Sequence, residues 1–211
     1  MSGILILAAG GHAKVVADIL LASGYSVAGY LDDDSSLWGQ TRLGIPILGA
    51  MAAFDSYAPD GLVIGVGDNA ARREITNRLG LVASDLLINA IHPAAVVARS
   101  VTLGRGVVIA AGAIVNPDTI IADGAIVNTG ASVDHDCVVG AYAHVAPGAR
   151  LAGGVRVGVG ALVGIGSVAI PGASIGSWST IGAGAAVVTD IPDACTAVGV
   201  PARVIEEMPR K

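Results

Sequence analysis

The sequence predicts an α/β domain with a parallel sheet, followed by a parallel β-helix, and three observations support this. Strand-like and helix-like segments alternate over residues 1–88, which is typical of a parallel sheet covered by helices. From Ile91 onward nearly every sixth residue is aliphatic, and a period of six is the signature of a β-helix. Aromatic residues make up only 3% of the chain, while 30 of its 211 residues are glycine. The core is therefore aliphatic, and tight turns are frequent.

The first domain, residues 1–88, is expected to be Rossmann-like. Apolar runs at 4–7, 27–31 and 62–66 predict three buried strands. Helical spacing of apolar residues predicts helices over 13–23 and 69–79, each followed by a glycine that can end it. Strand, helix and strand in this order place the strands side by side in a parallel sheet.

The second domain, residues 89–211, carries two six-residue registers that stay in phase. The aliphatic register holds in sixteen of seventeen places from Ile91 to Val187, and only Ala169 weakens it. Four residues after each of these positions comes a small or β-branched residue. Three hexads make one triangular coil, which buries its apolar edge against the neighbouring coils. The hexads resemble those of known left-handed β-helices, so we assign a left hand, although crossovers between parallel strands are normally right-handed.

Charge and hydropathy exclude several classes of function. The net charge is −5 and no basic run occurs, so nucleic acid is not an expected partner. Residues 157–189 carry no charge and are long enough to cross a bilayer. Their glycines, Pro171 and six-residue period argue against a membrane helix. The N-terminus lacks the features of a signal peptide, and Cys137 and Cys195 have no metal-binding or redox spacing. We expect a cytoplasmic protein with free thiols.

Two of the four histidines lie in the hexads but outside both core registers, so His135 and His144 should point outward. His135 stands between Asp134 and Asp136. A neutral imidazole can accept a proton near neutral pH, and a neighbouring carboxylate can orient the ring. The alternative is a surface histidine among polar neighbours. His144 follows half a coil later, so the two rings should lie on different faces of one chain.

The outward positions of the hexads are mostly Ala, Gly, Asn and Thr rather than Lys or Glu. A surface so poor in charge suits burial between subunits, and flat-sided prisms can pair their faces around a threefold axis. We therefore expect a homotrimer with a pocket between subunits that uses both His135 and His144.

Together with the hexads, three segments resemble the PglD/NeuD-type sugar acetyltransferases. They are the opening run of residues 4–13, the string Asn-Thr-Gly-Ala-Ser-Val-Asp-His-Asp at 128–136, and the ending Gly-Val-Pro-Ala-Arg at 199–203. The resemblance covers nearly the whole chain. It implies transfer of an acetyl group from acetyl-CoA to the amine of a nucleotide-linked 4-amino-4,6-dideoxy sugar, without a metal.

The resemblance also implies roles for individual residues. His135 would be the general base, Asp136 would raise its basicity, and Asn128 would lie near the substrate amine. Acetyl-CoA would be bound by His144, Gly153, Ile165, Ala183 and Arg203, with the Gly153 N–H facing the thioester oxygen. Cys137 falls in the inward register, and no other activated nucleophile is evident. Direct transfer in a ternary complex is therefore favoured over an acyl-enzyme.

The loops after the N-terminal strands form the candidate nucleotide site. Gly10 and Gly11 precede a helix, where backbone N–H groups can approach a phosphate. The family usually has glycine in place of Ala8, a departure that weighs against close approach of the diphosphate. His12 could bind phosphate or sugar, or be a turn histidine. Additional candidates follow the second and third strands, where such groups bind ribose or base or simply form turns: Asp32, Asp33 and Gly67.

Three other functions compete with this one. The first is O-acetylation of sialic acid or of another sugar hydroxyl, which the sequence distinguishes poorly from acetyl transfer to an amine. A γ-type carbonic anhydrase would need three histidines on zinc, and only two lie in the hexads. A non-catalytic sugar-binding scaffold is the third. The sequence leaves open which sugar and which nucleotide are bound.

Overall fold

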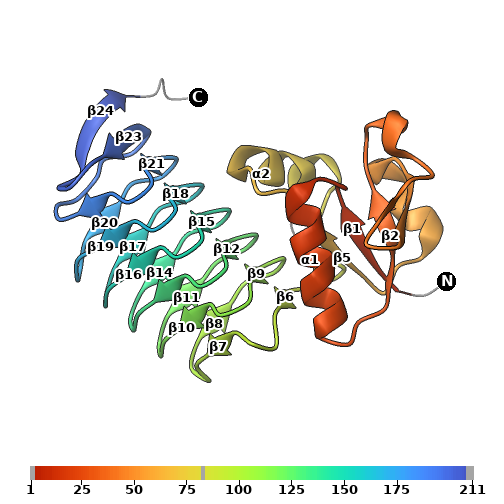
Figure 1. Cartoon of the computed structure of the whole chain (residues 1–211), viewed down its shortest axis with the longest axis horizontal. Helices are drawn as coiled ribbons and strands as arrows, with labels where there is room; N and C mark the ends of the chain where they lie inside the picture. The colour runs from red at the N-terminus through yellow and green to blue at the C-terminus, as the bar shows by residue number, and fades with distance from the viewer. Residues whose placement is uncertain (1–2, 82–83, 208–211) are drawn as a thin grey trace. The chain divides into compact units, whose positions relative to one another are not determined.

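The computed structural model describes residues 3–81 and 84–207 (Figure 1). The chain divides into two compact units, Met1–Pro93 and Ala94–Lys211, and the expected boundary at residue 88 falls a few residues before this division. Among the described residues, no helix has both the length and the apolar character needed to cross a membrane.

The N-terminal unit is a mixed five-stranded sheet with helices, as its fold class predicts. The sheet order is β3-β4-β2-β1-β5, parallel except that β3 runs antiparallel to β4. The strands are β1 (Ile4–Leu7), β2 (Val27–Leu31), β3 (Thr41–Arg42), β4 (Ile45–Gly49) and β5 (Gly61–Ile64). The helices are α1 (Gly11–Ala22), α2 (Asn69–Arg78) and the short 3₁₀ segments η1 (Ser35–Leu37) and η2 (Met51–Tyr57).

All four residues of β1 are buried because both sides of the sheet are covered. Leu5 and Leu7 pack with residues of η2, β5 and α2 in one cluster, and Ile6 lies on the opposite side of the strand, close to Ala13 of α1. This double burial explains why β1 is a continuous apolar run rather than an alternating one.

Two predicted boundaries were wrong by two residues, and the two predicted helix ends by one. The third strand ends at Ile64, not at residue 66, because the carbonyl oxygens of Val66 and Gly67 accept hydrogen bonds from the Arg72 guanidinium instead of from a strand. The first helix begins at Gly11, ahead of residue 13, with Gly10 as an N-cap that contributes no side-chain hydrogen bond. The elements β3, η1, β4 and η2 were not anticipated.

The C-terminal unit is a parallel β-helix of two-residue strands that recur every six residues. After β6 (Ala90–Ile91), the strands are β7 (Val96–Val97), β8 (Thr102–Leu103), β9 (Val108–Ile109), β10 (Ile114–Val115), β11 (Ile120–Ile121), β12 (Ile126–Val127), β13 (Ser132–Val133), β14 (Val138–Val139), β15 (His144–Val145), β16 (Arg150–Leu151), β17 (Arg156–Val157), β18 (Leu162–Val163), β19 (Val168–Ala169), β20 (Ser174–Ile175), β21 (Thr180–Ile181) and β22 (Ala186–Val187). A hairpin of β23 (Cys195–Val198) and β24 (Arg203–Glu207) closes the end.

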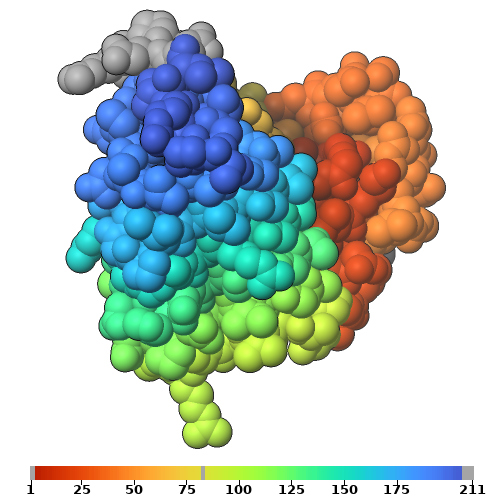
Figure 2. Space-filling view, turned by 60° about the vertical axis from the view of Figure 1, so that its left-hand side comes forward, coloured from red at the N-terminus to blue at the C-terminus, as the bar shows by residue number. Residues whose placement is uncertain are grey.

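Every third strand stacks on the same face, which gives the helix three faces. The first holds β22-β19-β16-β13-β10-β7, the second β20-β17-β14-β11-β8, and the third runs from β23 through β21, β18, β15 and β12 to β9. We call them the first, second and third faces. Figure 2 shows the coils stacked as successive layers along the unit.

Both predicted registers are confirmed inside the helix. Aliphatic residues from Ile109 to Val187 are buried, and so are the small residues four places later from Val107 to Ala185. Ala169 keeps its inward position, while Ile170 points out and is 44% exposed, so the register does not slip. Val97 and Leu103 are only half-buried because they lie in the first coil of the stack.

A third register was not anticipated. From Leu103 to Ile181, the backbone has a positive φ three residues after each interior position, and these positions are mostly glycine, such as Gly130 and Gly154. Asp118, Asp136, Tyr142 and Trp178 are the non-glycine members. A positive φ is one that glycine adopts without steric cost, which accounts for many of the glycines of this half.

Candidate active site

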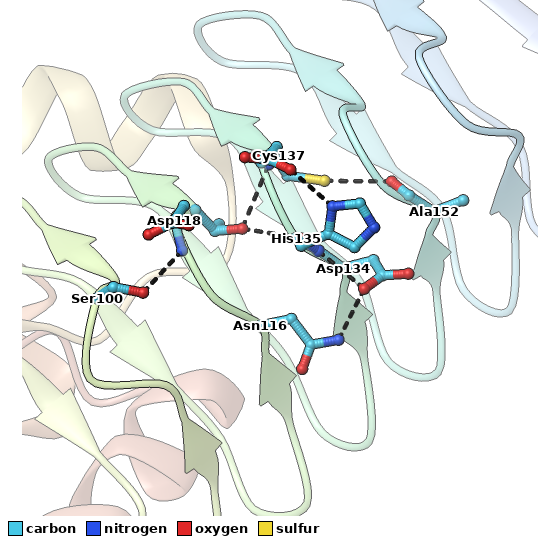
Figure 3. Close-up of polar contacts among 9 residues, drawn as sticks. Ser100, Asn116, Asp118, Asp134, His135, Cys137 and Ala152 are labelled. Carbon is cyan, nitrogen blue, oxygen red and sulfur yellow. Dashed lines mark hydrogen bonds and ion pairs between the residues drawn. The ribbon is translucent and has the colours of Figure 1, made fainter.

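His135 lies on the turn between β13 and β14, at the edge where the first face meets the second (Figure 3). Its neighbour Asp136 has φ 59°, a conformation that aspartate tolerates better than most residues. The His135 Nδ1 atom lies 2.7 Å from Asp136 Oδ2. The His135 side chain is 60% exposed, so it points outward, as predicted.

The two flanking carboxylates make the His135 imidazole more basic. The hydrogen bond with Asp136 is the largest cause of a raised pKa, and the negative charge of Asp134 adds to it. With Nδ1 occupied as the donor to Asp136, the neutral tautomer leaves the lone pair of Nε2 directed away from that carboxylate. This arrangement is suited to accept a proton from a group that approaches Nε2.

Side chains of the preceding coil hydrogen-bond to the turn that carries His135. The Asn116 side-chain amide donates to Asp134 Oδ1 at 2.8 Å, and the same oxygen accepts the His135 N–H at 2.8 Å. These hydrogen bonds lower the pKa of Asp134, with the Asn116 bond as the largest cause. Thr119, fully buried, donates its hydroxyl to the Asp134 carbonyl oxygen at 2.8 Å. The backbone that carries His135 is therefore fixed on two sides.

Gly153 occupies the position of His135 one coil later. A Cβ atom on this glycine would lie 2.6 Å from His135 Cε1 and 2.7 Å from Nε2, so the ring stands directly over the Gly153 Cα. A side chain at this position would displace the ring. Because the Gly153 N–H donates to no atom of the described residues, it is available to donate to a ligand oxygen.

Cys137 is inward-facing and fully buried, as predicted. Its thiol donates to the Ala152 carbonyl oxygen at 3.2 Å, and burial is the largest cause of a raised pKa. A buried thiol with a raised pKa is a poor nucleophile, which favours direct transfer.

A second group of candidate residues gathers on the third face and the edge that follows it. Asn128 follows β12, and its side-chain nitrogen lies 2.9 Å from Nε2 of His144, the outward residue of β15. Ile165 and Ala183 follow β18 and β21 on consecutive coils, and the Gly184 N–H donates to the Ile165 carbonyl oxygen. Ile165 is 61% exposed and offers an apolar contact to a ligand.

His135 and His144 thus lie on different parts of the prism within one chain, as predicted. The pair His135 and Gly153 belongs to the edge after the first face, and Asn128, His144, Ile165 and Ala183 belong to the third face and its edge. Arg203 begins β24 and is exposed, with Nη1 donating to the Ala202 carbonyl oxygen.

The N-terminal candidates gather at the carboxyl ends of the parallel strands. Ala8, after β1, has φ 92°, a conformation that glycine prefers. Gly10 and Gly11 follow it, and an added Cβ at either would meet open space. Ligands of such sheets bind at this edge, so the loop is placed as a nucleotide site requires.

His12 and Gly67 come together from two loops. A Cβ on Gly67 would lie 3.8 Å from the Cβ of His12. Arg72, 1% exposed, donates to the carbonyl oxygens of Val66 and Gly67 and thereby fixes the loop after β5. Burial, and then the charge of Arg72, lower the pKa of His12 to about 4. His12 is therefore neutral at pH 7 and can meet a phosphate only as a hydrogen-bond donor.

Asp32 and Asp33 both bond to the protein itself. Asp32 accepts the N–H groups of Ala9 and Asp34, so it ties the end of β1 to the end of β2. Asp33 accepts the Met51 N–H and pairs with Arg78 at 2.6 Å, and the hydrogen bond from Arg78 is the largest cause of its lowered pKa. Both carboxylates shape this edge of the sheet.

Sequence reasoning missed Asn116, although a signal was present. The residue directly after each interior aliphatic is nearly always Ala, Gly or another apolar residue. The polar exceptions between residues 98 and 188 are Asn116, Asn128 and Asp134. Asn128 bonds to His144, and Asn116 bonds to Asp134, which directly precedes His135. Polar residues in a register of small ones therefore mark the histidine sites.

Within the described residues, no group of three or more His, Cys, Asp or Glu side chains is arranged to hold a metal.

Comparison with known proteins agrees with this geometry. Residues 3–79 match the family model of the PglD N-terminal domain. The crystal structure of PerB from Caulobacter crescentus, in complex with CoA and GDP-perosamine, is 43% identical over 97% of both chains, with a TM-score of 0.89. The chain belongs to the PglD-type sugar acetyltransferase family.

Other members of the family support the same assignment. The acetyltransferase domain of PglB from Neisseria gonorrhoeae, solved with acetyl coenzyme A, is 37% identical over 96% of this chain and 98% of that chain, with a TM-score of 0.88. A UDP-N-acetylbacillosamine N-acetyltransferase of Bacillus subtilis is 41% identical over 111 residues. The chain spans half or less of the length of the curated relatives it matches. The resemblance seen in the sequence is confirmed.

Proposed function

We propose that this protein transfers the acetyl group of acetyl-CoA to the amine of a nucleotide-linked 4-amino-4,6-dideoxy sugar, with His135 as the general base. The observation that carries the proposal is the exposed His135 ring, held by one carboxylate and flanked by a second, directly over Gly153. The family members crystallised with CoA and GDP-perosamine, or with acetyl coenzyme A, support both substrates.

The chemistry follows from the positions of these atoms. Only the free amine attacks a thioester, so His135 Nε2 takes a proton from the nitrogen as the new N–C bond forms. The Asp136 carboxylate accepts the Nδ1–H and stabilises the imidazolium. The C–S bond then breaks, and the proton held by His135 can pass to the leaving thiolate, which gives free CoA thiol and the N-acetyl sugar.

The Gly153 N–H is the donor proposed for the thioester oxygen. Negative charge develops on that oxygen during attack, and a fixed backbone N–H stabilises it without rearrangement. Because the ring lies against Gly153, the base would reach the attacking amine while this donor reaches the oxygen of the same thioester. His144, Ile165, Ala183 and Arg203 would bind the rest of acetyl-CoA, and Asn128 would lie near the substrate amine.

We also propose a homotrimer with active sites between subunits, because His135 and His144 lie on different parts of one β-helix. The face of one chain that carries His144 would meet the edge of another that carries His135, and a closed threefold ring satisfies all three chains. The nucleotide would be held at the edge loops of the N-terminal sheet, by Gly10, Gly11, His12, Asp32, Asp33 and Gly67.

A substrate panel tests the proposal. UDP-, GDP- and dTDP-linked 4-amino-4,6-dideoxy sugars, and sialic acid, are each incubated with acetyl-CoA while free thiol release is followed. We expect release with one of the amino sugars. Release with sialic acid alone would establish O-acetylation instead, and no release with any acceptor would leave a sugar-binding scaffold. Two variants of the Caulobacter enzyme, in which a histidine is replaced by alanine or asparagine, were crystallised with CoA and GDP-perosamine, so the corresponding complexes of His135 variants are practicable.

A further inference from the structure

Asn116 and Asp134 form a polar pair at a position of the β-helix edge that is otherwise apolar from coil to coil. They follow β10 and β13, one coil apart, each directly after an interior valine. The same position in the other coils of this edge holds Ala98, Ala152, Ile170 and Val188. The Asn116 amide points at Asp134, with Nδ2 at 2.8 Å from Oδ1 (Figure 3). Because the other coils need no polar residue at this position, we expect this pair to have a role in the neighbouring His135 turn.

The pair is connected to the imidazole through the backbone of the turn. The Asp134 oxygen that accepts from Asn116 also accepts the His135 N–H at 2.8 Å. If Asn116 did not hold it, this partly exposed carboxylate could rotate to water and release the His135 N–H. The Thr119 hydroxyl holds only the Asp134 carbonyl oxygen, not its carboxylate, so Asn116 is the side chain that fixes the carboxylate.

We propose that Asn116 is a positioning residue for His135 that acts through Asp134, keeping one carboxylate both on the His135 N–H and beside the imidazole ring. This inference rests on the proposed function, in which His135 is the base. Asn116 touches no reacting atom. It determines where the second negative charge near the ring is located.

The charges around the ring define what a variant should change. On its own turn the ring meets the carboxylates of Asp134 and Asp136, both of which raise the pKa of His135. The next coil presents Gly153, which has no charge. The preceding coil places Asp118 where Asp136 stands in this one, and the Asp118 N–H donates to Ser100. Asp134 is the one of these carboxylates that Asn116 holds.

The first experiment compares Asn116→Ala with Asp123→Ala. The control removes another coil-to-coil hydrogen bond, that of the Arg105 N–H to Asp123 Oδ1, of the same 2.8 Å length. We expect Asn116→Ala to lower kcat/KM about tenfold, because the base is less well oriented. The acid limb of its pH profile should move to lower pH, because the Asp134 carboxylate is then farther from the imidazole and raises the pKa of His135 less. Asp123→Ala should change neither.

The second experiment exchanges the two side chains, in the double variant Asn116→Asp with Asp134→Asn. The new amide at position 134 could donate to the new carboxylate at position 116, and its oxygen could still accept the His135 N–H. The geometry is then restored while the negative charge moves one coil away from the ring. We expect kcat/KM to recover to within about threefold of the wild-type value, compared with about tenfold losses in both single variants. The acid limb should remain at lower pH.

A measurement without substrate separates this inference from the proposed function. The imidazole of His135 is titrated by NMR in the resting protein, with His135→Asn used to assign its signal. Asn116→Ala should lower the His135 pKa, and Asp123→Ala should leave it unchanged. If the wild-type protein transfers acetyl groups but neither the pKa nor the rate responds to Asn116→Ala, the positioning role is wrong. If the pKa responds but the wild type has no activity, the coupling stands and the proposed function fails.

Discussion

His135 and His12 show how the two halves of the molecule use the same side chain in opposite ways. His135 is exposed on a β-helix turn between two carboxylates, which raise its pKa. His12 is largely buried at the start of α1 beside Arg72, and its pKa falls to about 4. One environment favours the imidazolium and the other excludes it. A histidine at a candidate site is therefore a base or a neutral hydrogen-bonding group according to its surroundings.

The two halves also differ in how they position their side chains. In the β-helix, each turn is repeated one coil later, so a group is aligned by its predecessor and successor, as His135 is by Asn116 and Gly153. In the N-terminal unit, loops of different lengths are fixed by individual bonds, such as those from Arg72 to the loop after β5. Because the coils repeat, the position of a side chain in the β-helix can be predicted from the six-residue spacing of the sequence.

The sharpest test of this comparison is to remove each histidine in turn. His135→Ala should lower kcat/KM by about a hundredfold or more, the usual contribution of general base catalysis. His12→Gln retains a neutral hydrogen-bonding side chain and should lower it by less than about tenfold, because His12 is neutral before substitution. The measurement is steady-state thiol release at saturating acetyl-CoA. Equal losses in both variants would show that the two histidines do not have separate roles.

Prediction of the fold from the sequence succeeded where the period was regular. The hexad registers located the interior of every coil between Ile109 and Val187, because each residue there meets the same environment every six places. The region between β2 and β5 was not predicted, since its short strands and 3₁₀ turns depend on single contacts such as the Asp33–Arg78 pair. Local patterns do not encode contacts between residues so far apart in sequence.

Site prediction followed the same division. His135 was found outside the core registers and next to Asp136, and the structure adds that they bond. The burial of His12 was not predicted, because it depends on the loop after β5, whose Gly67 lies close to the His12 side chain. Whether the residues assigned by resemblance bind acetyl-CoA and nucleotide stays a prediction.

A second test uses the lowered pKa of His12 to sharpen the comparison. In the unfolded chain His12 binds a proton below pH 6.5, but the folded protein resists protonation until about pH 4. Stability is therefore fully present above pH 6.5 and is lost as the pH falls toward 4, by about 3 kcal/mol at most. In His12→Gln this part of the pH dependence should disappear. Urea unfolding of the N-terminal unit at pH 7 and pH 5 measures it, and identical pH dependence in both proteins would contradict the burial of a neutral imidazole.

A third test removes the space over Gly153. In Gly153→Ala the new methyl group would overlap the His135 ring, at 2.6 Å from Cε1, so the ring must move. The backbone φ here is not positive, and alanine adds no conformational strain of its own. We expect kcat/KM to fall by some tens of fold with little change in the thermal unfolding temperature. Unchanged activity would mean that the ring works from another position, whereas a large loss of stability would mean that the clash is relieved by the backbone and not by the ring.

The smallest predicted effect concerns Ala8, a non-glycine residue with a positive φ. Its φ of 92° costs about 1–2 kcal/mol for a residue with a Cβ. In Ala8→Gly the relief of that strain opposes the loss of a buried methyl group, about 0.8 kcal/mol, and the larger entropy of glycine in the unfolded chain, about 0.5–1 kcal/mol.

The net change for Ala8→Gly should thus be within about 1 kcal/mol of zero, since the strain cancels the other two effects. Ala9→Gly is the matched control, because Ala9 is also buried but has no positive φ, and it should destabilise by about 1.5 kcal/mol. Chemical denaturation of both variants decides the point. Equal destabilisation would mean that Ala8 is unstrained. A difference between them would show that the N-terminal unit tolerates, at the loop where it is expected to bind a diphosphate, a conformation that the β-helix assigns mostly to glycine.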